Sequence, residues 1–217
     1  MDRTGIVNLV LGRCGRREGD TYMVAQAKLE LGLIQERLEG GAFLPWFLLT
    51  NEQTLTTVAN VREVSLPANF LREWDDYPLQ RYDATASPIY KKLEKEDFDV
   101  LLEEFDGDGV GEPKAYALTG DVFSFFTTPD TAYSIKWRYY AKDTVLSDSV
   151  LDNAWTANAT DLLIAELGIV MAGQYARRPD LVQIFGVQKA EAIKRLTAFD
   201  IARMQAARAA VRGDRSN

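Results

Sequence analysis

The chain has 217 residues, of which 47% are hydrophobic, and its 32 acidic side chains outnumber its 25 basic ones, which gives a net charge of −7. This length allows one sizeable core or two small ones, and the negative charge argues against sequence-specific binding of nucleic acid. Histidine is absent, which removes imidazole bases, Ser-His and Cys-His nucleophile pairs and most zinc and iron sites, so we expect no catalytic, cofactor or metal site.

The sequence gives no sign of a membrane span or of export. No run of about 18 apolar residues occurs, and residues 1–5 lack the layout of a secretory signal. Cys14 is the only cysteine, which excludes an internal disulfide and fits a reducing compartment. We therefore expect synthesis in a cytoplasm.

Residues 1–42 are predicted to be helical. A short helix is expected over residues 4–13, and Asp20 is expected to cap a longer one that ends at Gly40 and Gly41. Apolar residues recur every three to four positions along the longer helix, as on a packed face. They are Met23, Ala27, Leu31, Ile34 and Leu38.

Residues 43–142 are predicted to be mainly β, with one helix near residues 89–105. Strands are expected over residues 46–49, 54–58, 61–66 and 78–82. Pro88 suits the first turn of the predicted helix, because proline lacks an N–H that this position would leave unbonded.

A three-stranded antiparallel meander is predicted after residue 115. Residues 116–118 and 122–127 flank a tight turn at residues 119–121, and Pro129-Asp130 forms a second turn before the third strand, residues 133–140. The third strand alternates with the period of a half-buried strand. Its predicted inner residues are Tyr133, Ile135, Trp137 and Tyr139.

Residues 157–212 are predicted to form two helices. Asn158 is expected to cap a central helix that extends to Tyr175, and Arg178-Pro179 separates it from a long final helix. The predicted inner stripe of the final helix is Ala190, Ile193, Thr197, Ile201 and Met204. The predicted fold class is α+β, in a single domain over residues 1–217: a helical bundle of N-terminal helices plus two C-terminal helices, with an antiparallel β-meander or hairpin insertion.

Two acidic stretches contain residue types that are used in metal binding and catalysis. Residues 106–111 begin like a calcium loop, but Val110 and Ala117 stand where that loop needs oxygen ligands. A paired-carboxylate enzyme would have to use the acids of residues 94–108. These acids lie among other charges, which favours a solvated helix face followed by a polar loop.

Four short motifs follow one another between residues 116 and 148. They are Tyr-Ala-Leu-Thr-Gly-Asp at 116–121, Thr-Pro-Asp-Thr-Ala-Tyr at 128–133, Arg-Tyr-Tyr-Ala-Lys at 138–142 and Leu-Ser-Asp at 146–148. Their order, with a helix before the strands and two helices after them, resembles the head-to-tail adaptor proteins of tailed bacteriophages. Adaptor-like sequences usually bring an Asn and a Trp together after the last motif, whereas here Ala154 separates Asn153 from Trp155.

The resemblance implies a structural virion protein of the neck rather than an enzyme. It implies a ring, of twelve subunits in this family, that joins the portal to the tail and lets DNA pass through its lumen. The implied partners are other copies of the chain, the portal protein, a tail or stopper protein and genomic DNA without sequence-specific binding, with no membrane and no cofactor. Two alternatives stay open: another neck component, such as a stopper or tail-completion protein, and a carboxylate-based carbohydrate-active or ligand-binding domain.

Charge is distributed unevenly along the chain. From residue 186 onward there are seven basic and three acidic residues, a net of +4, whereas the remainder carries −11. We expect the final helix to dock on the portal through Arg203, Arg208 and Arg212. The acids of residues 94–112 are expected to face the channel or the solvent, since unpaired carboxylates are costly in a dry interface. The expected channel- or solvent-facing acids are Glu103, Glu104, Asp106 and Asp108.

Overall fold

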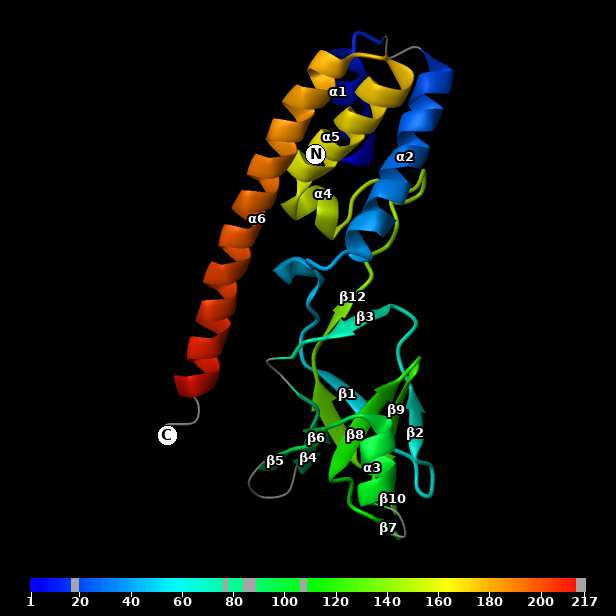
Figure 1. Ribbon diagram of the computed structural model, residues 1–217, viewed down its shortest axis with the longest axis vertical. Coiled ribbons are helices and arrows are strands. Elements are labelled where there is room, and N and C mark those ends of the chain that lie inside the picture. The colour runs from blue at the N-terminus through cyan, green and yellow to red at the C-terminus, as the bar shows by residue number, and fades with distance from the viewer. Residues whose placement is uncertain (17–19, 76–77, 84–88, 106–108, 214–217) are drawn as a thin grey trace. The chain divides into compact units, whose positions relative to one another are not determined.

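The computed structural model describes residues 1–16, 20–75, 78–83, 89–105 and 109–213 (Figure 1). In the last helix it describes the side chains up to Arg203 and that of Gln205. The chain forms two compact units, one made of Met1–Leu48 with Lys142–Asn217 and the other of Leu49–Ala141. We call them the helical unit and the β unit. Their mixture of helices and antiparallel sheets confirms the predicted α+β class.

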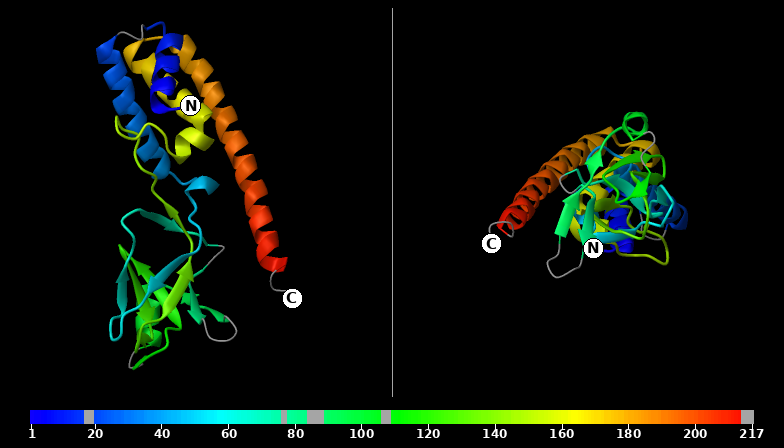
Figure 2. Two further views of the ribbon diagram at one scale, coloured as in Figure 1. Left: turned by 180° about the vertical axis from the view of Figure 1, so that it is seen from behind. Right: turned by 90° about the horizontal axis from the view of Figure 1, so that it is seen from below.

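The helical unit is built around one central helix. Its elements are α1 (Arg3–Arg13), α2 (Thr21–Glu39), the 3₁₀ turn η1 (Trp46–Leu48), α4 (Ala154–Asn158), α5 (Thr160–Val170), the π-helical turn η2 (Met171–Tyr175) and α6 (Pro179–Gly213). Helix α5 lies between α2 and α6 and also packs on α1, as the front and back views agree (Figures 1 and 2). The sequence predicts this position, because apolar residues cover most of the circumference of α5 and its residues 162–168 are all buried.

The helix α2 begins at its predicted cap, and α1 begins one residue before its predicted start, after a cap that was not predicted. The Asp20 carboxylate accepts a hydrogen bond from the Met23 N–H at 3.1 Å, and Asp2 caps α1 by accepting one from the Gly5 N–H at 2.7 Å. Along α2 the predicted inner residues Met23, Ala27, Leu31 and Ile34 are buried, whereas Leu38 is half-buried.

The predicted cap at Asn158 is wrong. Asn158 is the last residue of α4, and its side chain donates to the Ala154 carbonyl at 2.9 Å. The cap is Asn153, whose carboxamide oxygen accepts from the Thr156 N–H at 3.1 Å while the Thr156 hydroxyl oxygen accepts from the Asn153 N–H at 2.8 Å. This reciprocal capping box satisfies two backbone donors and begins the separate short helix α4. The predicted central helix is α5, whose N-cap residue is Ala159, one position after Asn158.

The predicted inner stripe of α6 is also wrong. Among the described side chains of α6, the buried ones are Phe185, Ala192 and Leu196, whereas Ala190, Ile193 and Ile201 of the predicted stripe are exposed. The cause lies on the facing helix, where a β-carbon added to Gly168 would come within 2.4 Å of the Phe185 ring. The ring of Phe185 thus occupies the space above a glycine, and this contact fixes the rotation of α6 about its axis.

The β unit contains two four-stranded sheets within its described residues. Their strand orders are β1-β11-β4-β5 and β2-β9-β8-β6, and two short pairs, β12-β3 and β10-β7, accompany them. The strands are β1 (Gln53–Thr56), β2 (Glu63–Ser65), β3 (Phe70–Glu73), β4 (Gln80–Asp83), β5 (Ile89–Lys92), β6 (Glu94–Lys95), β7 (Val110–Gly111), β8 (Ala115–Thr119), β9 (Val122–Phe126), β10 (Thr128–Pro129), β11 (Ser134–Trp137) and β12 (Tyr139–Ala141), with the helix α3 (Phe98–Glu104).

The first hairpin of the predicted meander is confirmed, but its third strand joins the other sheet. Strands β8 and β9 pair across a turn in which Gly120 has a φ of +59°. Strand β11 instead pairs with β1 and β4. Its predicted inner residues Ile135 and Trp137 are buried, and the Trp137 ring packs edge-on against Phe123 of β9 at 5.0 Å between centroids. Apolar side chains of β11 therefore meet β9 face to face across a core, rather than side by side in one sheet.

Two further predictions for this region are wrong. Residues 46–48 form the 3₁₀ turn η1 instead of a strand. Residues 89–105 do not form one helix: β5 pairs with β4, β6 pairs with β8, and α3 begins only after Asp97. Pairing with β4, the preceding strand, and with β8, which follows α3, overrides the local helical pattern here. Pro88, the proposed first residue of that helix, lies outside the described residues.

Candidate assembly sites

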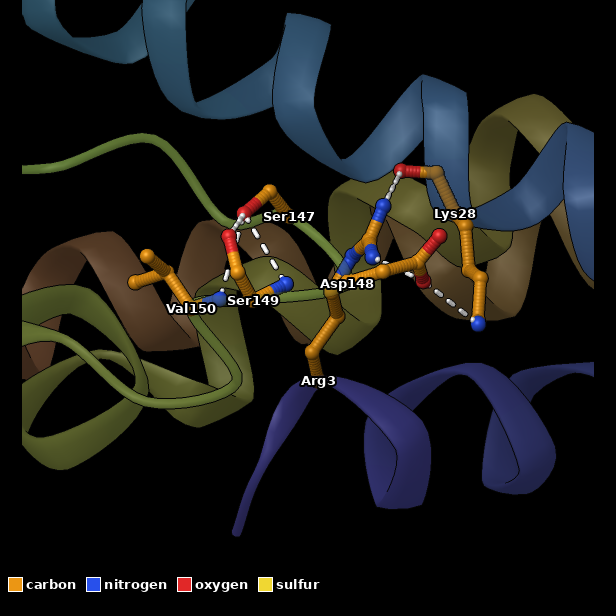
Figure 3. A network of polar contacts seen from close by, with 6 residues as sticks. All are labelled: Arg3, Lys28, Ser147, Asp148, Ser149 and Val150. Atoms are coloured by element: carbon orange, nitrogen blue, oxygen red, sulfur yellow. Dashed lines mark hydrogen bonds and ion pairs between the residues drawn. The ribbon is translucent and has the colours of Figure 1, made fainter.

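The Leu-Ser-Asp motif at residues 146–148 forms an ionic clamp between the first two helices (Figure 3). The Asp148 carboxylate accepts hydrogen bonds from the Arg3 guanidinium at 2.9 Å and from the Lys28 ammonium at 2.7 Å. Arg3 is buried and also donates to the Lys28 carbonyl at 3.0 Å. The neighbouring Lys28 and Arg3 charges hold the pKa of Asp148 below its ordinary value. The motif thus joins α1, α2 and the loop before α4.

Serine 147 shapes the turn that presents Asp148. Its hydroxyl oxygen accepts from the Val150 N–H at 3.1 Å and the Ser149 N–H at 3.3 Å, and it lies 3.0 Å from the Ser149 hydroxyl oxygen (Figure 3). Side chains of this kind commonly satisfy the backbone of a turn. The Leu-Ser-Asp motif therefore combines a turn former with a charged clamp.

A second, buried cluster binds the same loop to the end of α2. The side-chain oxygen of Gln35 accepts from the Leu146 N–H at 3.1 Å and from the Asn153 carboxamide at 2.9 Å. One oxygen of Glu39 accepts from the Trp155 indole N–H at 2.8 Å and from the Gln35 carboxamide at 3.0 Å. Buried polar groups need hydrogen-bond partners, and here the side chains of α2 and of the loop supply them to each other.

The residue between Asn153 and Trp155 has its own place in this cluster. Ala154 is the first residue of α4, and its N–H donates to the Asp143 carboxylate at 2.7 Å. Asn153 and Trp155 then reach Gln35 and Glu39, which lie one turn apart on α2. The insertion of Ala154 is therefore compatible with both side chains holding the loop.

A buried carboxylate connects the central helix to both flanking helices. Glu166 of α5 lies 2.8 Å from Arg37 of α2 and 2.8 Å from Lys189 of α6. Glu166 is buried, whereas the two cations are partly exposed and keep contact with water. The sequence contains a signal for this residue: Glu166 is the single acid within the otherwise apolar run 162–170, and a buried acid requires a partner.

The residues of the clamp and of the α2 cluster were predicted only in part. The sequence singled out Asp148, Asn153 and Trp155, but not their partners Arg3, Lys28, Gln35 and Glu39. Gln35 and Glu39 interrupt the buried side of α2 with polar side chains, which is the signal that would have pointed to them.

Of the predicted portal-docking residues, Arg203 has a described side chain, and its partner is aromatic. The Arg203 guanidinium carbon lies 3.5 Å from the centroid of the Trp46 ring in η1. One helical turn earlier, burial raises the pKa of the Asp200 carboxyl. The side chains of Arg208 and Arg212 lie outside the described residues.

The predicted channel-facing acids are described in part. Glu103 and Glu104 are exposed in the last turn of α3. Asp106 and Asp108 lie outside the described residues, as does Gly107 between them.

A hollow of about 520 Å³ in the β unit is one place where a carbohydrate or another small ligand could bind. Its lining includes Glu73, Tyr116 and Lys95. The Tyr116 hydroxyl donates to Glu73 at 2.9 Å, and the Lys95 ammonium lies 2.5 Å from the other Glu73 oxygen. Burial, together with the Glu73 carboxylate, raises the pKa of Tyr116 far above its ordinary value. Glu73 is thus bound on both oxygens, unlike the free acid and base that a glycosidase uses.

Among the described residues, no three side chains of the Cys, Asp and Glu types converge as metal ligands. No helix in the described ranges is long and apolar enough to cross a bilayer.

The clamp, the α2 cluster and Glu166 all hold helices and loops together, as in a subunit that acts through its surfaces. A family model described as "SU10 adaptor protein" matches residues 19–216. The chain therefore belongs to the SU10 adaptor family, which is a family of structural adaptor proteins of bacteriophages and not a class of enzymes. Membership implies a virion component that assembles with portal and tail proteins. A search of curated proteins found no match.

Proposed function

We propose that the chain is the head-to-tail adaptor itself: a subunit of the ring, of twelve copies, that joins the phage portal to the tail. The observation that carries this proposal is the match to the adaptor family over residues 19–216, which include nearly all of both units. The ring lies in the virion neck, is assembled from chains made in the host cytoplasm, and lets genomic DNA pass through its lumen without sequence-specific contacts.

The charge distribution supports an orientation for this ring. The segment from residue 186 onward carries a net charge of +4 on a chain of −7, so the end of α6 suits an acidic surface of the portal, with Arg203, Arg208 and Arg212 as anchors. The acids Glu103, Glu104, Asp106 and Asp108 face the channel or the solvent. A tail or stopper protein binds the opposite face of the ring.

The proposal is tested with phage heads that carry the portal but no neck protein. Purified chain is added to these heads and, as a control, to heads that lack the portal. We expect an additional ring of density below the portal by cryo-electron microscopy, and no binding to the control heads. If the chain ignores bare portals but binds heads that already carry an adaptor ring, or binds free tails, it is a stopper or tail-completion protein and the adaptor assignment is wrong.

A further inference from the structure

One face of α2 exposes apolar side chains at regular intervals. Tyr22 is 64% exposed, Leu29 58% and Leu33 50%, and Ala25 and Glu36 are also exposed. At 3.6 residues per turn, these five residues fall within an arc of about 80° and extend over about 21 Å. We call them the α2 stripe.

The outer face of α6 repeats the same spacing. Val187 is 61% exposed and Ile201 53%, and Ala190, Lys194 and Ala198 between them are exposed as well. In both sets the steps along the chain are three, four, four and three residues, so these residues also lie within an arc of about 80° over about 21 Å. We call them the α6 stripe.

The two stripes lie on opposite flanks of the helical unit. Helix α5 is located between α2 and α6 in both the front and the back view (Figures 1 and 2). The packed side of α6, with Phe185, Ala192 and Leu196, is buried, and the α6 stripe is on the other side. A ring needs this arrangement, because each copy must offer one surface to the preceding copy and a different surface to the next.

The composition of the two stripes favours contact between them. Exposed apolar rows of this length are typical of interaction surfaces rather than of a free monomer surface. Lys194 lies in the middle of the α6 stripe, whereas Glu36 ends the α2 stripe, so each stripe carries one charge of opposite sign. Ala25, Ala190 and Ala198 are small and allow two helices to approach closely.

We infer that the α6 stripe of one copy packs on the α2 stripe of the next copy and so closes the ring. This inference rests on the proposed function, which supplies the ring, and adds the surfaces that hold it together. The occupant of each stripe is thus a second copy of this chain.

The test uses two surface variants that each destroy one stripe. The α2 variant carries Leu29→Asp and Leu33→Asp, and the α6 variant carries Val187→Asp and Ile201→Asp. A control carries Val100→Asp and Leu102→Asp, which are 49% and 43% exposed on α3 of the β unit. Circular dichroism confirms that each variant is folded. Assembly is measured by mass photometry on the free chain and by electron microscopy on portal-bearing heads.

We expect each stripe variant to lose ring formation, with association weakened roughly a hundredfold or more, because unpaired carboxylates would have to be buried. The control should assemble like the natural chain. A mixture of the two stripe variants should form dimers and nothing larger, since one intact α2 stripe and one intact α6 stripe remain in each pair. Lys194→Glu should weaken association roughly tenfold, because it places a carboxylate in the middle of the apolar contact.

Three outcomes separate the two proposals. If the natural chain forms rings and both stripe variants do so as well, the stripe assignment is wrong while the adaptor function stands. If the mixed variants fail to form the dimer although each is folded, the stripes do not contact each other. If the natural chain forms no ring, either free or on heads, both proposals fail.

Discussion

Gly168 lies where α5 meets α6, and its missing side chain makes room for the ring of Phe185. A methyl group at this position would overlap the ring, since the added β-carbon would lie 2.4 Å from it. We expect Gly168→Ala to lower the free energy of unfolding by about 1–3 kcal/mol, measured by urea denaturation. This cost should exceed the helix-propensity gain that alanine normally brings.

The adjacent Gly186 provides a matched control, because a β-carbon there would meet no atom within 4 Å. Gly186→Ala should be neutral or stabilise the protein by up to about 1 kcal/mol. Replacing Phe185 with the smaller leucine in the Gly168→Ala background should recover part of the loss. Equal costs for the two alanine variants would show that the contact with Phe185 does not determine the packing.

The clamp at Asp148 makes a pH-dependent contribution to stability. Its pKa in the folded chain lies below the ordinary value of 3.8 because of Lys28 and Arg3. The contribution is therefore fully present above pH 3.8 and is lost as the pH falls through the lowered pKa. We expect Asp148→Asn to have a lower thermal unfolding midpoint than the natural chain at pH 7, and the gap should close as the pH falls from about 4 towards 2. A gap that stays constant down to pH 2 would exclude the ion pairs as its source.

At the scale of elements, the sequence predicted the helices, caps and turns that are determined by residues close together in the chain. The helices α1 and α2, the cap at Asp20, the hairpin of β8 and β9 and the final helix all follow from capping, periodicity and turn residues. The strands β5 and β6 were missed because pairing with β4 and β8 overrides the helical pattern of residues 89–105. The rotation of α6 was missed because a glycine on another helix determines it.

The same limit applies to the assembly sites. Asp148, Asn153 and Trp155 belong to a segment that was recognisable, but their partners are located on α1 and α2, more than a hundred positions away in the chain. Periodicity and local motifs depend only on residues that are close in the sequence, so they cannot predict which distant residues will pair. The order of the motifs was enough to predict the family of the protein. It was not enough to predict the residues that bind those motifs in the folded chain.

The basic end of α6 is predicted to set the affinity for the portal. We expect the triple variant Arg203→Gln, Arg208→Gln and Arg212→Gln to bind portal-bearing heads at least about tenfold more weakly, because each lost charge reduces electrostatic attraction to an acidic surface. The natural chain should also lose affinity as salt rises. Co-sedimentation with heads measures both effects.

The matched control removes three exposed basic residues elsewhere, through Arg13→Gln, Lys92→Gln and Lys142→Gln. It changes the net charge equally and should bind like the natural chain. Equal losses in the two variants would mean that total charge, rather than the end of α6, governs binding. Loss of Arg203 also removes the contact with Trp46, so the thermal unfolding of both variants is measured alongside.

At the scale of the whole molecule, the acids around the end of α3 are predicted to act on DNA rather than on assembly. We expect the combined variant Glu103→Gln, Glu104→Gln, Asp106→Asn and Asp108→Asn to form rings normally but to retain DNA more strongly. Like charge keeps a duplex away from the wall, over a screening length of about 8–10 Å at ordinary salt. Retention of duplex DNA by assembled rings in a gel-shift assay measures the effect.

A control with Glu63→Gln, Asp121→Asn and Asp152→Asn neutralises exposed acids elsewhere in the chain. It should retain DNA no more strongly than the natural chain does. Failure of the α3 variant to assemble would place these acids in an interface or a core and would overturn the prediction.

The two ends of the β unit lie next to each other. Its first and last residues meet, because Leu49 and Tyr140 form a β-bridge and the Thr50 N–H donates to the Tyr139 carbonyl at 2.9 Å. A segment whose ends are adjacent can be exchanged for another of different length without changing the path of the chain on either side. Residues 49–141 can therefore change in length or sequence while the helices on either side keep their own sequence and packing.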